Sequence, residues 1–408
     1  MLQSSPGEAQ SAAIAAFGAD QEVAPPDADV AVGPRDVAET VNNTLAFFLR
    51  TGAPSGALDI NKFVGAPAGS HVTDPRIIYN QQSGRFIFSV LSLSDTSCSS
   101  MVFLLISDSA DPKGTWFEVA IPEQSSSNFG DQPRLGVSDN LVTVSVDAYS
   151  CADSSFVGDE LVVIQKSDLI AHAIGAHSAN FYNQGPFGLL PVQSIGPTTT
   201  QYVIFNDSNP GNRVGIYVLR GTPEAQNVTV AFGAQPMNTP TAVGPNGRTA
   251  AAKQNGPTTL ATGDDRFLNA VWQNGHIWTA GGTNCTPSGD TVVRSCLAYL
   301  RIDADAGGSV TGDLQLPFVG VSGKYLYYPA VSVDRADNLV TVFNESSATT
   351  FESIVVAGIN VAAGGTTLTS FTTLHTSATY YNYGGTTCQT LTAGCRWGDY
   401  GGAAQDPT

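Results

Sequence analysis

The chain has 408 residues, a formal net charge of −17 and a pI near 4.4. Nucleic-acid and anionic membrane surfaces need clustered Lys and Arg, so this charge argues against both functions. Gly (42) and Pro (23) are frequent and only 13% of residues are charged, as in proteins with many short strands joined by turns. No run of about 18 apolar residues occurs, and we expect no membrane insertion. The sequence therefore predicts an acidic all-β protein.

The first residues, "MLQSSPGEAQ", lack the basic and apolar regions of a signal peptide. We expect residues 1–24 to form a flexible N-terminal extension and residues 25–408 to form a single domain. The expected location is extracellular, with the signal peptide already removed from this chain.

A repeated pattern follows along the chain. An apolar strand, a turn rich in Asn, Asp or Gly, and an alternating strand begin at Asp74, Asp131, Asp264 and Tyr327. A third strand follows each hairpin. After three of the hairpins a fourth strand is also plausible. The interval from Asp74 to Asp131 is 57 residues, within the range of a four-stranded propeller blade. The repeat therefore predicts a β-propeller.

The count of repeats predicts seven blades, the last of them incomplete. A weaker repeat lies within residues 189–221, and the N-terminal residues 28–60 supply one more. The final segment, "RWGDYGGAAQDPT" (396–408), then forms the innermost strand of the seventh blade. Because open sheet edges are prone to association, we expect the natural chain to continue with the outer strands. The alternative is a ring of six blades with the final segment packed outside it.

The six cysteines predict three disulfides and an oxidising compartment. Cys285 and Cys296 flank one short segment, and Cys388 and Cys395 flank another. Cys98 and Cys151 follow similar strands of neighbouring repeats, so they are suited to bridging adjacent loops. None of these spacings is the close pair of a zinc site.

The starts of the innermost strands are the candidate ligand site, because these strands converge on the central channel of a propeller. The candidate residues are Asp74, Arg76, Asp131, Arg134, Asp265, Arg266, Tyr328, Arg396 and Asp399. Asp and Arg side chains two residues apart lie on the same face of a strand. One interpretation is that they neutralise each other at the channel rim. The other is a basic pocket lined by carboxylates that recognises an acidic sugar.

Several segments in order resemble a group of secreted bacterial β-propeller proteins that are loosely described as sialidase-like. They include "DPRIIYNQQSGRF", "DQPRLGVSDN", "DDRFLNAVWQNGHIWTA" and "RWGDYGGAAQDP", and the resemblance covers most of residues 25–408. It implies an exported propeller whose activity is unassigned. "SADPKGTW" (109–116) is similar to the Asp box of sialidases but has one extra residue, and the Arg-Ile-Pro motif of sialidases is absent.

Two function classes remain open. The first is a binding or scaffold module that recognises extracellular carbohydrate or protein at the channel mouth. The second is a polysaccharide lyase or glycoside hydrolase acting on an acidic glycan. No catalytic residue is assigned, no cofactor is predicted, and we expect a monomer. The alternating carboxylates of "DADAGGS" (303–309) are compatible with calcium, but a hairpin turn is the favoured interpretation.

Overall fold

The computed structural model describes residues 7, 9–18, 24–123, 125–173, 175–207, 213–236, 248–361, 363–382, 388 and 394–408. Within these residues the chain is almost entirely β-structure, which confirms the predicted class. None of the helices in this part of the chain is long and apolar enough to cross a bilayer.

The described residues form six four-stranded antiparallel units, which we call sheets 1 to 6. Four of these units are separate sheets, whereas sheets 3 and 5 are joined through a short strand, β14 (Gln193–Ser194), into one nine-stranded sheet. The strands of sheets 1, 2 and 3 are β1 (Ala28–Val32), β2 (Asp36–Val41), β3 (Thr44–Leu49) and β4 (Pro54–Asp59); β5 (Ser70–Asn80), β6 (Arg85–Ser94), β7 (Ser100–Ser107) and β8 (Trp116–Pro122); and β9 (Asn128–Val137), β10 (Leu141–Ser150), β11 (Phe156–Gln165) and β12 (Ser178–Gly185). The predicted hairpins at Asp74 and Asp131 are therefore confirmed as β5–β6 and β9–β10.

The remaining three sheets repeat this order. The strands of sheets 4, 5 and 6 are β13 (Leu190–Pro191), β15 (Gln201–Asp207), β16 (Arg213–Arg220) and β17 (Thr229–Pro236); β20 (Phe267–Gln273), β21 (His276–Cys285), β22 (Arg294–Ala304) and β23 (Val310–Gln315); and β24 (Lys324–Val333), β25 (Leu339–Ser347), β26 (Thr350–Ile359) and β27 (Thr369–Thr376). The short strand β14 (Gln193–Ser194) continues β13 and pairs in parallel with β9 and β20. The first strands of sheets 3, 4 and 5 therefore lie side by side.

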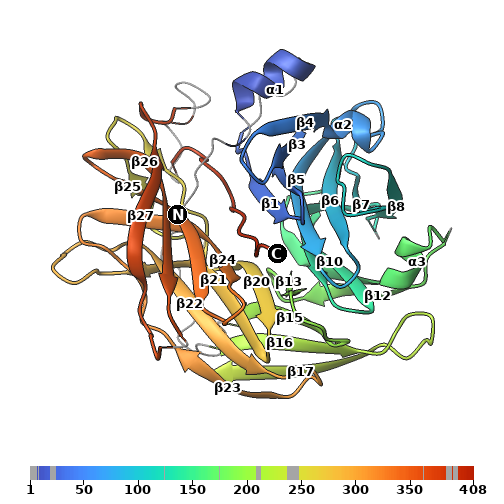
Figure 1. Cartoon of the computed structure of the whole chain (residues 1–408). Coiled ribbons are helices and arrows are strands. Elements are labelled where there is room, and N and C mark those ends of the chain that lie inside the picture. The colour runs from blue at the N-terminus through green and yellow to red at the C-terminus, as the bar shows by residue number, and fades with distance from the viewer. Residues whose placement is uncertain are drawn as a thin grey trace.

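The sheets surround a common centre, near which the C-terminus lies (Figure 1). Burial decreases from the inner to the outer strands: β6 has seven consecutive buried residues, whereas every residue of β27 is exposed. Apolar clusters join successive sheets, from sheet 1 to sheet 6. Sheets 2 to 5 thus bury both faces against neighbouring sheets, and sheets 1 and 6 bury one face each in this way, which defines the molecule as a β-propeller.

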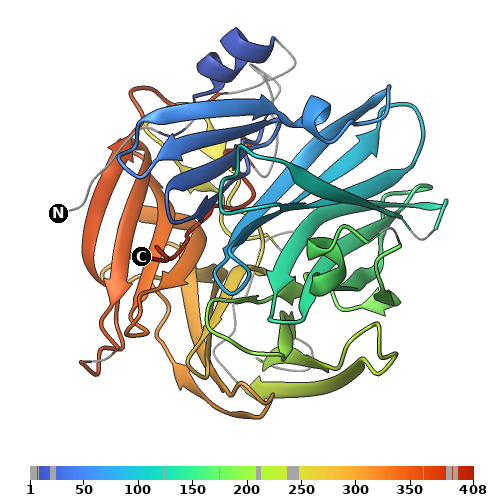
Figure 2. The same cartoon turned by 45° about the vertical axis from the view of Figure 1, so that its right-hand side comes forward.

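The C-terminal segment, residues 394–408, lies between sheets 6 and 1 (Figures 1 and 2). Gln405 Nε2 donates to the Val333 carbonyl of sheet 6 at 2.7 Å, and the Asp399 amide donates to Asp27 Oδ1 at 2.8 Å. Arg50 of sheet 1 forms an ion pair with Asp406. The segment has no strand assignment after Cys395, so the predicted innermost strand of a seventh blade stays a prediction.

In the part of the chain that the structure describes, the elements outside the sheets include three helices and one small hairpin. They are α1 (Gln10–Phe17), α2 (Ile60–Phe63), α3 (Lys166–Ile170) and the hairpin of β18 (Ala252–Lys253) and β19 (Thr259–Leu260). Helix α1 falls within the predicted N-terminal extension, whose other residues are mostly outside the described ones. The proposed domain boundary at residue 24 stays a prediction. The favoured hairpin at 303–309 is confirmed, because it joins β22 to β23.

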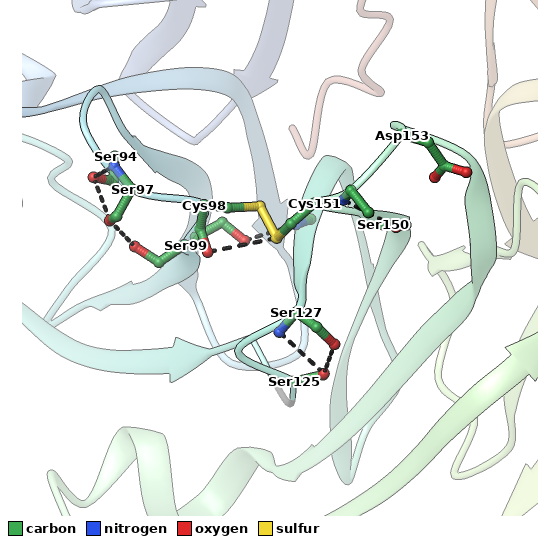
Figure 3. The surroundings of a disulfide bond; sticks show 12 residues. Ser94, Ser97, Cys98, Ser99, Ser125, Ser127, Ser150, Cys151 and Asp153 are labelled. Atoms are coloured by element: carbon green, nitrogen blue, oxygen red, sulfur yellow. Dashed lines mark hydrogen bonds between the residues drawn. A yellow bond between two sulfur atoms is a disulfide. The ribbon is translucent and has the colours of Figure 1, made fainter.

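The three predicted disulfides are confirmed, and all lie at the same end of the sheets. Cys98–Cys151 joins the β6–β7 loop of sheet 2 to the β10–β11 loop of sheet 3, with serine side chains around it (Figure 3). Cys285–Cys296 closes the β21–β22 loop, and Cys388–Cys395 precedes the C-terminal segment. This is the end at which the innermost strands begin, because Ser94 pairs with Ser70, the first residue of β5. The disulfides therefore brace the loops around the candidate site.

Candidate functional site

A β-bulge recurs near the start of three innermost strands. In each, a residue followed by proline has a left-handed backbone: Asp74 (φ 53°), Gln132 (φ 46°) and Tyr328 (φ 49°). The strand pairing shifts at the same places in β5, β9 and β24. Proline has no N–H for a sheet ladder, so a bulge accommodates it, and the bulge redirects the preceding side chain. A repeated local sequence thus places three polar side chains at one end of the ring.

A polar cavity of about 290 Å³ lies at this end of the sheets. Its lining residues are Asp131, Gln132, Tyr149, Arg248, Thr262, Gly263, Asp264, Arg266, Leu268, Gly282, Tyr328, Arg396 and Asp399. We call it the mouth cavity. Its walls come from sheets 3, 5 and 6, the segment before sheet 5, and the C-terminal segment.

Arg266 is fixed at the base of this cavity by carboxylates on both sides. Its Nε and Nη2 donate to Asp264 at 2.9 and 2.7 Å, and its Nη1 contacts Asp147 at 3.0 Å. Gln132 Oε1 accepts a further hydrogen bond from Arg266. Burial would raise the pKa of Asp264, but Arg266 outweighs it and the pKa is lowered. Asp264 is therefore an ionised carboxylate at neutral pH.

Behind Arg266 lies a second arginine that is 2% exposed. Arg134 donates to Asp147 at 2.6 and 3.1 Å and contacts Asp159 at 3.4 Å. Burial alone would raise the pKa of Asp147, but Arg134 and Arg266 hold it at about 2. The pKa of Asp159 is raised by its burial and by the charge on Asp147. Two arginines thus share one buried carboxylate, and neither is free to bind a ligand.

A different group of acids lies where sheets 1 and 2 meet the C-terminal segment. Asp27 and Asp74 are 1% and 5% exposed, respectively. The backbone amide of Gln132 donates a hydrogen bond to Asp74 Oδ2 at 3.2 Å. Burial and the nearby Asp399 raise the pKa of both acids. Burial, with Asp74 and Asp147 nearby, raises the pKa of Asp131 to about 7. Asp131 is therefore a lining carboxyl group that still carries its proton in part at neutral pH.

Arg76 lies outside the mouth cavity, deeper in the ring. Its guanidinium carbon is 3.3 Å from the centroid of the Tyr400 ring, a cation–π contact. Tyr400 Oη donates to the Pro75 carbonyl at 2.9 Å. Arg76 also favours ionisation of Asp29, whose pKa burial nevertheless raises to about 6. This arginine fixes the C-terminal segment against sheet 2.

The structure brings together five of the nine predicted site residues: Asp131, Arg266, Tyr328, Arg396 and Asp399 line the mouth cavity. The others do not line it, and they are Asp74, Arg76, Arg134 and Asp265. Asp264 lines the cavity in place of its predicted neighbour Asp265, whose carbonyl accepts a hydrogen bond from Asn206 Nδ2 at 2.9 Å.

Sequence reasoning missed several lining residues, above all Gln132, Tyr149 and Arg248. Gln132 precedes a proline in the same way as Asp74, and this could have identified it. The hairpin register could have identified Asp147, which lies opposite Asp131. Arg248 is exposed and belongs to none of the six sheets, so the strand pattern carried no signal for it.

No family model and no curated protein matches the chain. Among solved structures it is similar to an arabinanase from Bacillus subtilis (12% identity, TM-score 0.37, covering 83% of this chain and 95% of that one). It is also similar to an exo-1,5-α-L-arabinanase from a bovine ruminal metagenomic library (9% identity, TM-score 0.39, covering 84% of this chain and 96% of that one). A third similar structure is a sialidase of Trypanosoma rangeli in complex with 2,3-difluorosialic acid (12% identity, TM-score 0.35, covering 80% of this chain and 51% of that one). At these TM-scores the similarities assign neither a function nor any residue.

Proposed function

We propose that the mouth cavity binds a neutral carbohydrate and that the protein is a glycan-recognition propeller. The observation that carries this proposal is the balance of charge in the cavity wall. Its three arginines, Arg248, Arg266 and Arg396, face three aspartates, Asp131, Asp264 and Asp399. With Asp131 partly protonated, these groups offer many hydrogen-bond donors and acceptors but at most a small net charge for an ion to neutralise. This arrangement suits the hydroxyl groups of a neutral sugar better than the carboxylate of an acidic one.

The pairing of the arginines is consistent with this ligand. Arg266 is held by Asp264 and Asp147, and Arg396 forms an ion pair with Asp399. A cluster built for a sugar carboxylate would need guanidinium groups free to make bidentate bonds. Concave walls with a few fixed polar groups are typical of small-ligand sites.

The test is calorimetric titration of the protein with neutral gluco-, manno-, galacto- and xylo-oligosaccharides, with oligogalacturonate and sialyllactose as acidic comparisons. We expect binding within the neutral series. Arg248→Ala should weaken it about tenfold, through loss of a charged hydrogen-bond donor. Arg35→Ala is the matched control, because Arg35 is an exposed arginine in the β1–β2 turn, at the opposite end of sheet 1. Binding of acidic ligands alone, or of none, would contradict the proposal.

Hydrolysis of the bound glycan is a second candidate function, favoured by the two protonation states within one cavity. Asp131 has a pKa of about 7, and the pKa of Asp264 is lowered. A protonated and an ionised carboxyl group are the acid and base that glycoside hydrolysis requires, with water as the second substrate. The same samples, assayed for new reducing ends, separate the two functions. If the protein is an enzyme, Asp131→Asn should abolish the activity, and the wild-type activity should fall as the pH rises above about 7. A binding module would produce no new reducing ends in any sample.

We further propose that the protein is exported and that its ring has room for seven blades. The three disulfides support an oxidising compartment. "DYGGAAQD" (399–406) aligns with "YYPAVSVD" (327–334) at the start of sheet 6, and it lies between sheets 6 and 1. Both observations support an innermost strand at this position. A crystal structure with residues 396–408 outside the ring would contradict this assignment.

A further inference from the structure

Aromatic side chains form a continuous row across sheet 3, at the end where the mouth cavity lies. Phe129, Tyr149 and Phe156 occupy opposite positions on β9, β10 and β11. The Phe129 and Tyr149 rings are stacked with centroids 5.8 Å apart, and Phe156 meets Tyr149 edge-on at 5.8 Å. Phe187, from the loop after β12, meets Phe156 edge-on at 5.2 Å. We call these four residues the aromatic row.

The aromatic row is continuous with the mouth cavity. Tyr149 lines the cavity itself, and the guanidinium carbon of Arg266 is 4.1 Å from the centroid of the Phe187 ring. From Tyr149 the row leads outward to Phe156, which is 39% exposed. A ligand in the cavity that is longer than one unit would therefore meet an aromatic surface next.

Core packing does not account for the row. The apolar clusters that join the sheets, as far as the structure describes them, contain none of its four residues. Exposed aromatic rings beside a polar cavity are a common feature of ligand grooves. The row is also held in place, since the loop between Tyr149 and Phe156 carries Cys151 of the disulfide to Cys98 (Figure 3). Such a fixed loop loses little conformational entropy when a ligand binds.

We propose that the aromatic row is a second subsite, which binds a further sugar unit of the same neutral oligosaccharide through the apolar C–H face of its ring. The proposal rests on the proposed function of the mouth cavity. A sugar ring has hydroxyl groups at its rim and C–H groups on its faces, so an oligosaccharide can form hydrogen bonds to the cavity with one unit and pack on Phe156 with a unit farther along the chain. The preferred ligand is then an oligosaccharide chain and not a monosaccharide.

The experiment compares chain lengths. Neutral oligosaccharides of two and of six units, from whichever series binds the wild-type protein, are titrated into wild type, Phe156→Ala and Phe156→Trp. Phe232→Ala is the matched control, because Phe232 is a more exposed phenylalanine (59%) on β17, the outermost strand of sheet 4. The melting temperature of each variant checks its folding, and Phe156 is exposed enough for its truncation to be tolerated.

We expect Phe156→Ala to weaken binding of the six-unit chain about two- to tenfold and to leave binding of the two-unit chain unchanged. Phe156→Trp should keep the wild-type affinity, and Phe232→Ala should change neither ligand. Equal affinities of wild type and Phe156→Ala for the six-unit chain would overturn the subsite and leave the cavity proposal standing. If the wild type binds no chain of either length, the proposed function falls and the subsite with it.

Discussion

Two groups of aspartates lie around the mouth cavity, and their pKa values are shifted in opposite directions. Asp147 is buried and Asp264 partly buried beside Arg266, which keeps both ionised. Asp27 and Asp74 are also buried, but a further carboxylate, Asp399, lies beside them and raises their pKa further. Burial is common to both groups, so the nearest charge decides the outcome. The chain thus forms an ion-pair network in one half of the site and a set of acids with raised pKa values in the other.

The largest expected effect comes from breaking the ion-pair network. Arg134→Met should lower the free energy of unfolding by about 3–5 kcal/mol, because Asp147 would keep its buried negative charge with only Arg266 beside it. Urea unfolding at pH 7 measures this change. Arg50→Met is the control: its ion pair with Asp406 is exposed, and its loss should cost about 0–1 kcal/mol. Equal losses in the two variants would show that the network contributes no more than a surface pair.

The next effect is a loss of stability as the pH rises. Asp29, Asp131 and Glu352 have pKa values raised to about 6, 7 and 8, chiefly by burial. A raised folded-state pKa means that the stabilisation is complete below the unfolded-state pKa, near 4, and is lost as the pH passes the folded value. Asp147 and Asp264 act oppositely, but their contribution is lost only below pH 4. We therefore expect a higher melting temperature at pH 5 than at pH 8.

Glu352 offers a variant that sharpens this test. It is 1% exposed and accepts a hydrogen bond from Tyr327 Oη. Glu352→Gln cannot ionise, so the difference in melting temperature between pH 5 and pH 8 should shrink. If the melting temperature of the wild type is constant or rises from pH 5 to pH 8, the raised pKa values of Asp29, Asp131 and Glu352 do not determine how stability depends on pH.

The smallest expected effect is that of Asp74→Asn. Asparagine tolerates the left-handed backbone at this position, and its Oδ1 can still accept a hydrogen bond from the backbone amide of Gln132. At pH 5 the free energy of unfolding of the variant should lie within about 1 kcal/mol of wild type, because burial and Asp399 raise the pKa of Asp74 and so favour its neutral form, which asparagine resembles. At pH 8 it should be relatively more stable. If Asp74→Asn were as damaging as Arg134→Met at both pH values, Asp74 would be an ionised member of the network.

Much of the fold was predictable from the sequence because its signals are local. The hairpins at Asp74, Asp131, Asp264 and Tyr327 follow from strand alternation and turn residues, and the pairing confirms all four. The disulfides were also predictable, because each cysteine lies in or beside a loop of the same kind. The place of residues 396–408 was not, because it depends on how far the sheets turn around the axis, which no local pattern encodes.

The site was predictable in outline and not in its pairing. Inner-strand starts identified Asp131, Arg266 and Tyr328 as lining residues. Nothing in the spacing of Arg134 shows that it bonds to Asp147 across the hairpin, because that choice depends on the bulge at Gln132. The same bulge decides which side chains face the cavity and which face the interior.

The sequence by itself determined the all-β class, the repeat, the disulfides and the end of the ring at which polar residues gather, since each of these follows from patterns within a few tens of residues. Only the tertiary structure decided which aspartates are ionised, which arginines are neutralised, and that Phe129, Tyr149 and Phe156 form one row. These properties depend on distances between side chains from different strands and sheets. Electrostatic and packing energies change over a few ångströms, a scale that sequence spacing does not specify.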